Sequence, residues 1–157
     1  MVHRGLLRSA LYVMVFSALF GCAQTPHTDT RTPQSSIPQD FRLLLSEGGG
    51  VTGRWQGFLI HADGQVFRWQ GGLARADSQQ VGRLKPEQLR SLWQQIRSEQ
   101  LLSAELLSPG NMSQKIEITA NGKTHRLIWA SNSDASPLQK QVSRLYDSWI
   151  RMIRDLE

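Results

Sequence analysis

Cysteine is almost absent from this chain of 157 residues, which contains a single one, Cys22. One thiol cannot form a disulfide within the chain, even in a compartment that permits such bonds. A lone cysteine therefore needs another role.

The patterns that mark metal and catalytic sites are also missing. The sequence has no His-x-x-x-His motif and no cysteine pair, and His27, His61 and His125 are far apart along the chain. It also has no G-x-S-x-G turn of the kind that exposes a nucleophilic serine. We therefore predict no metal site, no cofactor and no enzymatic activity, and we interpret His125 as a partly buried structural histidine.

Clusters of basic residues are missing as well. Removal of residues 1–21 takes away Arg4 and Arg8, which leaves 16 Lys and Arg (18 − 2) against 13 acids, a net charge of +3. These basic residues are scattered, whereas a nucleic-acid site needs them on one face. We expect no nucleic-acid partner.

The N-terminal segment has the layout of a secretion signal. Arg4 and Arg8 come first, without an acid, and residues 9–20 follow as a run of 12 uncharged residues. The next four residues, Leu19-Phe20-Gly21-Cys22, resemble the lipobox of bacterial lipoproteins. The resemblance implies that the chain is cut between Gly21 and Cys22 and that acyl chains are attached to Cys22.

Several acyl chains would hold the protein durably on a lipid membrane, since each buried methylene contributes about 0.8 kcal/mol. In the lipoproteins that the motif resembles, the residue after the cysteine influences sorting, and Ala23 favours the periplasmic face of the outer membrane. The alternative is an uncleaved membrane-spanning anchor. Only 15 uncharged residues separate Arg8 from Gln24, fewer than the roughly 20 that a spanning helix needs.

Composition divides the remaining chain into a tether and one domain. Residues 24–40 contain three prolines and a single aliphatic residue, Ile37, so they bury too little apolar surface to fold by themselves. We predict a lipidated cysteine and disordered tether over residues 22–40, with a reach of roughly 20–25 Å. Residues 41–157 are long enough for one globular domain.

Two hairpins are predicted within this domain, after a first short strand over residues 41–46. Asp63-Gly64 between residues 54–62 and 65–71 indicates a two-residue type I′ turn, which would pair Phe58 with Trp69 and Ile60 with Phe67. Asn121-Gly122 indicates a second such turn. It would pair Ile116 with Leu127, Ile118 with His125, Glu117 with Arg126 and Thr119 with Thr124.

Two amphipathic helices complete the pattern. One begins at Pro86 and carries Leu89, Leu92, Trp93 and Ile96 on one face. The other follows Pro137, and its apolar residues are Leu138, Val142, Leu145, Tyr146, Trp149, Ile150, Ile153 and Leu156. The predicted fold is α+β: an antiparallel sheet of about five strands with both helices on one face, in the order β-β-β-α-β-β-α.

Gly48, Gly50 and Gly53 form a G-x-G-x-x-G pattern, which in other proteins cradles phosphates. A dinucleotide site needs a helix after these glycines, whereas residues 54–58 are expected to form a strand. We interpret the segment as a flexible turn. Three of the five tryptophans fall on predicted core faces, which leaves Trp55 and Trp129, at strand ends, as a possible ligand platform.

Three segments occur in an order that resembles emfourins, a small family of bacterial inhibitors of thermolysin-like metalloproteases. They are SEGGGVTGRWQGFLIHADG, LKPEQLRSLWQQIRSEQLL and SQKIEITANGKTHRLIWAS, and residues 73–83 are additional to the pattern. The resemblance implies a non-catalytic binding domain that inhibits a metalloprotease.

An inhibitor needs a preorganised loop that enters the protease cleft. Two loops are candidates, one carrying Gly48, Gly49, Gly50 and Gly53, the other carrying Asn111 and Met112. The alternative function is a structural or interaction lipoprotein of the cell envelope without a protease partner.

Overall fold

The computed structural model describes residues 36–72, 77–130 and 135–156. The unit Pro33–Glu157 is compact, and the hydrophobic core lies entirely inside it. Because this unit has a core of its own, it can be produced and studied as a domain. Gly21, Cys22, the expected signal segment and most of the expected tether lie outside the described residues.

A seven-stranded mixed sheet forms one layer of the domain, with the strand order β4-β3-β2-β1-β6-β7-β5. Neighbouring strands are antiparallel, except that β5 runs parallel to β7. The strands are β1 (Arg42–Gly49), β2 (Arg54–His61), β3 (Gln65–Gly71), β4 (Asp77–Arg83), β5 (Leu106–Ser108), β6 (Met112–Ala120) and β7 (Lys123–Ala130).

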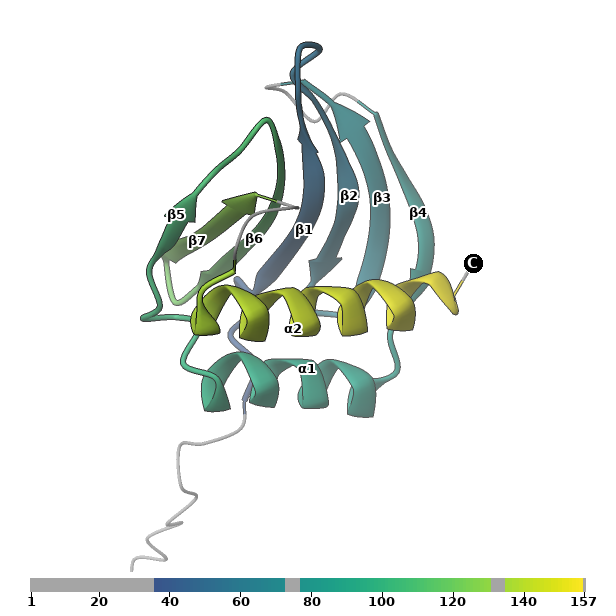
Figure 1. Cartoon of the computed structure of the whole chain (residues 1–157). Helices are drawn as coiled ribbons and strands as arrows, with labels where there is room; N and C mark the ends of the chain where they lie inside the picture. Colours follow the sequence, from purple (N-terminus) through teal and green to yellow (C-terminus); the bar gives the residue numbers. More distant parts are fainter. Residues whose placement is uncertain (1–35, 73–76, 131–134, 157) are drawn as a thin grey trace, which may run out of the picture. The chain divides into compact units, whose positions relative to one another are not determined.

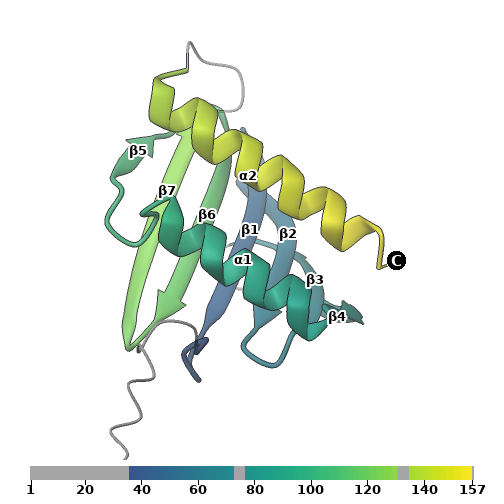
Figure 2. The same cartoon turned by 90° about the horizontal axis from the view of Figure 1, so that it is seen from below.

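Two helices form the second layer, α1 (Pro86–Ser98) and α2 (Pro137–Arg154). They lie side by side on the same face of the sheet (Figures 1 and 2), and the Trp149 indole N–H donates to Oε1 of Gln95 at 2.9 Å between them. Each helix begins at the proline that the sequence indicates. In the described part of the chain, neither helix combines the length and apolar character needed to cross a membrane.

The fold is therefore α+β, as predicted, but the expected sheet of five antiparallel strands is wrong in detail. Two further strands are present, β4 and β5, and the element order is β-β-β-β-α-β-β-β-α. Strand β4 has the sequence DSQQVGR and lies at one edge of the sheet, where few side chains are buried and no apolar alternation is required. Strand β5 has only three residues, too few to show a period.

The predicted pairing of the first hairpin is also wrong, by one residue. Ile60 pairs with Val66, and Phe58 pairs with Arg68. The connection has three residues, 62–64, because β2 ends at His61 and β3 begins at Gln65. A three-residue connection of this kind needs a left-handed residue at its end, and Gly64 supplies it with a φ of 85°.

The second hairpin confirms the sequence prediction in full. Ile116 pairs with Leu127, Glu117 with Arg126, Ile118 with His125 and Thr119 with Thr124. Both residues of the Asn121-Gly122 turn have positive φ, 53° and 72°, as a type I′ turn requires. His125 is half-buried, as predicted.

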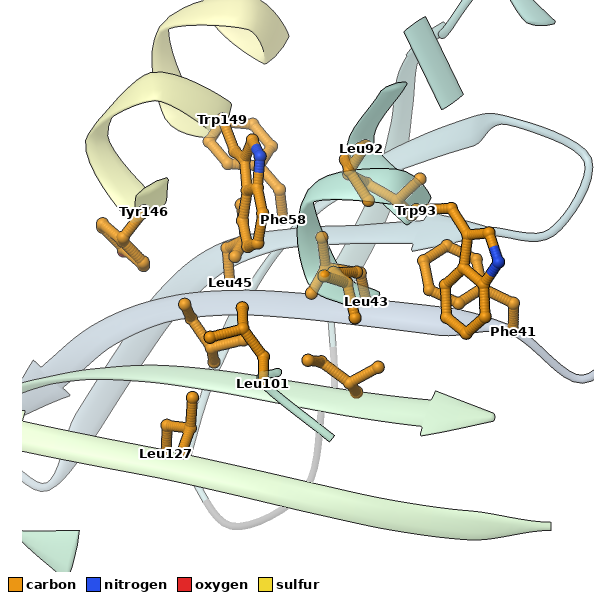
Figure 3. Packing of buried hydrophobic residues seen from close by; sticks show 14 of the residues in the cluster. Phe41, Leu43, Leu45, Phe58, Leu92, Trp93, Leu101, Leu127, Tyr146 and Trp149 are labelled. Atoms are coloured by element: carbon orange, nitrogen blue, oxygen red, sulfur yellow. The ribbon is translucent and has the colours of Figure 1, made fainter. Parts of the chain in front are cut away.

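The core fills the space between the helices and the sheet (Figure 3). Leu43 and Leu45 of β1 are fully buried beneath the helices, and Trp93 of α1 packs edge-on against Phe41 with ring centroids 5.3 Å apart. All four apolar residues predicted for the first helix are buried. Trp129, expected near the surface, is only 1% exposed, so it belongs to the core and cannot serve a ligand platform.

Trp69 is buried as predicted, but on the face of the sheet opposite the helices. The register shift in the first hairpin places it beside Gly57 rather than Phe58. A Cβ atom at Gly57 would lie 1.9 Å from the carbonyl oxygen of Leu45. Strands β1 and β2 therefore approach closely there, and only glycine fits between them.

The folded part of the chain begins before Phe41, the first residue of the domain predicted from the sequence. Ile37 is half-buried against the core, and the Asp40 carboxylate accepts hydrogen bonds from the backbone of the second hairpin turn. The composition of residues 24–40 does not reveal these contacts, because each depends on one individual side chain, that of Ile37 or that of Asp40.

Candidate protein-binding site

The two loops proposed from the sequence lie together at one end of the sheet. Strands β1 and β6 pair as far as Gly49 opposite Met112, so the turn after β1 and the residues before β6 are neighbours. We refer to residues 49–53 with Asn111 and Met112 as the glycine-rich tip. In Figure 1 the β1–β2 turn protrudes at the end of the strands that points away from the helices.

Backbone hydrogen bonds connect the two loops of the glycine-rich tip. The Gly50 N–H donates to the carbonyl oxygen of Asn111 at 2.5 Å. Gly49, with a φ of 113°, has the Asn111 carbonyl oxygen only 2.6 Å from where a Cβ atom would stand. Within the second loop, the Ser113 hydroxyl exchanges hydrogen bonds with the backbone of Gly110, at 3.0 and 3.2 Å. The turn is thus fixed by its neighbour, which its glycines alone could not achieve.

The glycine-rich tip presents apolar side chains to solvent. Val51 is fully exposed and Met112 is 48% exposed; among the described residues the only other exposed large apolar side chain is Leu107. Exposed apolar side chains gathered at one place are typical of a surface that contacts another molecule. The exposed Val51 and Met112 side chains suit binding to a partner molecule.

A depression of about 760 Å³ lies against the tip. Gly48, Gly49, Gly50 and Met112 of the sequence-predicted site line it, together with Trp55 and Arg54. Gly53 and Asn111 do not line it, although both belong to the loops that form its rim. The Trp55 ring is half-buried and carries the Lys115 ammonium group 5.0 Å from its centroid.

The surroundings of the glycines do not suit a phosphate site. Strand β2 begins directly after Gly53, so the chain offers no helix N-terminus at this loop. Within the described ranges, no three His, Cys, Asp or Glu side chains are grouped as metal ligands would be. The arrangement can bind a partner through backbone groups and apolar contacts.

Sequence reasoning missed Val51, although it is the only apolar residue within the GGGVTG turn. An apolar residue among glycines has nothing to pack against locally, and that contrast could have identified it. Trp55 was named from the sequence as a possible ligand contact, and it does line the depression. Its position beside the glycines was not predicted, because the pairing that brings Trp55 opposite Gly48 joins two strands.

A second depression, of about 360 Å³, lies between α2 and the helix-facing side of the sheet. We call it the α2 groove. On the sheet, Gln56 and Gln114 both pair with Glu47, so these three polar residues form one row across β2, β1 and β6. Two residues earlier on β1, the next residue on the same face of the sheet is the buried Leu45. The helix-facing side of the sheet therefore changes from apolar at Leu45 to polar at Glu47.

Tyr146 and Asp147 of α2 line the groove opposite Glu47. Burial raises the pKa of the Tyr146 phenol, and the nearby carboxylates of Glu47 and Asp147 raise it further, while Arg154 acts in the opposite direction. The phenol therefore stays protonated at physiological pH. Its hydroxyl group remains a hydrogen-bond donor.

Compared with known proteins, the chain matches no protein-family model and no curated protein. The structure defines the class of fold, a two-layer α+β domain with a protruding glycine-rich tip.

Proposed function

We propose that this chain is a membrane-anchored envelope lipoprotein whose globular unit is a non-catalytic binding domain. The anchor would be acyl chains on Cys22, as the Leu19-Phe20-Gly21-Cys22 motif implies. Within this proposal, the globular unit inhibits a thermolysin-like metalloprotease by inserting the glycine-rich tip into the active-site cleft.

One observation carries the proposal: the glycine-rich tip holds a fully exposed valine, Val51, on a turn that is hydrogen-bonded to a second loop. A protruding loop can reach into a cleft, and an apolar side chain at its apex can fill an apolar pocket there. Fixing the loop before binding lowers the entropy lost on association. The similarity of the segment order to emfourins favours a metalloprotease as the partner.

The test uses the purified unit Pro33–Glu157 and a panel of thermolysin-like enzymes. We expect peptide hydrolysis by at least one of them to fall in proportion to the added protein, with complete loss near one equivalent. Substitution Val51→Asp should weaken inhibition at least about tenfold, because it would place a charge in an apolar pocket.

Leu107→Asp is the matched control. Leu107 is also exposed and apolar, at 72%, but it lies on β5 at the edge of the sheet. This substitution should leave inhibition unchanged. Unchanged hydrolysis across the whole panel would exclude the inhibitor function and favour the alternative, an interaction lipoprotein of the cell envelope.

A further inference from the structure

The α2 groove has the size and the wall chemistry of a small-molecule site. Its volume of about 360 Å³ falls in the range of roughly 300–1,000 Å³ typical of ligand pockets. A sphere of that volume is roughly 9 Å across. Strands β1, β2, β3 and β6 provide the floor and α2 provides a wall, so the groove is built on rigid elements rather than loops.

Two polar groups on the floor are held in defined orientations. The Trp129 indole N–H donates to Oε1 of Gln114 at 2.9 Å, which leaves the Gln114 amide NH₂ as the group able to donate into the groove. The Gln56 amide donates to Oε1 of Glu47 at 3.0 Å, so the second carboxylate oxygen of Glu47 can accept another bond. Preoriented donors and acceptors of this kind fix a ligand's position.

Both signs of charge line this one groove. Glu47 and Asp147 are negative, whereas Arg151 and Arg154, on the last turns of α2, are positive. Arg68 of β3 is a third cation there, with its guanidinium carbon 5.9 Å from the centroid of the Phe58 ring. A ligand with only negative groups would face two carboxylates, and a purely positive ligand would face three guanidinium groups.

We propose that the α2 groove binds a short peptide with free amino and carboxyl ends. Glu47 and Asp147 receive the ammonium group, while Arg151 and Arg154 receive the carboxylate. The peptide groups between these ends lie over Gln56 of β2, while the Gln114 amide and the Tyr146 hydroxyl lie on the other side of Glu47, beside the ammonium end. Two or three residues fit, because an extended chain spans roughly 3.3–3.6 Å per residue.

The first experiment compares three probes by NMR titration of the isotope-labelled unit Pro33–Glu157. Triglycine has both charges, N-acetyltriglycine lacks the ammonium group, and triglycine amide lacks the carboxylate. We expect triglycine to shift the resonances of the groove residues, and each blocked peptide to bind at least about tenfold more weakly. Equal binding of the three peptides, or no response to triglycine, would overturn the proposal.

Substitutions in α2 then test which charged residue binds the amino end of the peptide and which binds the carboxyl end. Asp147 and Arg151 are exposed on α2, so replacing them leaves the core intact. Arg151→Gln should weaken triglycine and N-acetyltriglycine at least about fivefold without changing the affinity of triglycine amide. Asp147→Asn should weaken triglycine and triglycine amide but not the acetylated peptide.

Arg144→Gln is the matched control, since Arg144 is an exposed arginine of α2 that does not line the groove. It removes the same charge from the same helix and should leave all three affinities unchanged. If Arg144→Gln and Arg151→Gln weaken triglycine equally, the effect is one of net charge and the assigned site is wrong. The outcome is independent of protease inhibition, because the substituted residues lie outside the glycine-rich tip.

Discussion

The carboxylate of Asp40 accepts hydrogen bonds from the backbone N–H groups of Gly122, at 2.6 Å, and of the preceding residue, Asn121, at 2.9 Å. Asp40 and Gly122 are 82 positions apart in the sequence. This contact fastens the start of the globular unit to the turn of the second hairpin. These bonds lower the pKa of Asp40 below its ordinary value of 3.8, with the Gly122 N–H as the largest cause.

Replacing Asp40 with asparagine should therefore lower the melting temperature of the unit at neutral pH. A folded-state pKa below the unfolded value means that the carboxylate stabilises the fold above pH 3.8 and that this stabilisation is lost as the pH falls through the folded value. The difference between wild type and Asp40→Asn should shrink at acidic pH. Thermal unfolding over a pH series measures it, with Glu105→Gln, an exposed carboxylate outside the hairpin, as control.

A second prediction concerns the hydrogen bond between the helices, from the Trp149 indole N–H to Gln95. Trp149 is 2% exposed, so Gln95→Leu would leave a buried donor without its acceptor. The free energy of unfolding should fall by about 1–3 kcal/mol, measured by urea denaturation. In the background of Trp149→Phe, which has no donor, Gln95→Leu should cost clearly less; an equal cost in both backgrounds would contradict the assigned role.

The sequence predicts those parts of the fold that depend on neighbouring residues. Asn121-Gly122 determines both the turn and the register of the second hairpin, because its two residues accept positive φ and the flanking side chains alternate. Pro86 and Pro137 mark the helix starts for a similarly local reason. In the first hairpin, Asp63-Gly64 resembles the same turn, but the turn also includes Ala62, and one added residue changes the partner of Phe58.

The candidate sites follow from contacts that are distant in sequence. Gly49 and Met112 were proposed from separate loops, and their adjacency comes from the pairing of β1 with β6, which no local pattern specifies. The α2 groove was not predicted. It forms where the polar row that contains Glu47 lies opposite Tyr146 and Asp147 of α2, and this juxtaposition depends on tertiary packing.

Gly57→Ala tests the close approach of β1 and β2. A Cβ atom at this position would meet backbone atoms of Leu45 and Ser46 at 1.9–2.8 Å, and backbone cannot move aside as a flexible side chain can. We expect a loss of about 3 kcal/mol or more in the free energy of unfolding. Gly72→Ala is the control, since no heavy atom lies within 4 Å of its Cβ position. Equal stability of the two variants would show that the strands can separate there at little cost.

The final prediction concerns Cys22 and the proposed anchor. If acyl chains on this thiol hold the protein, the form extracted from membranes should begin at Cys22 and carry the mass of those chains, and it should incorporate a labelled fatty acid. Cys22→Ser should abolish the label, because a hydroxyl in place of the thiol provides no thioether for the lipid. Thr25→Ser, three residues further along, should be labelled like the wild type.

Mass spectrometry decides between this anchor and an uncleaved spanning segment. A membrane form with an intact Met1 end and a free Cys22 thiol would mean that residues 9–23, despite being shorter than the roughly 20 residues of a typical span, hold the protein in the membrane.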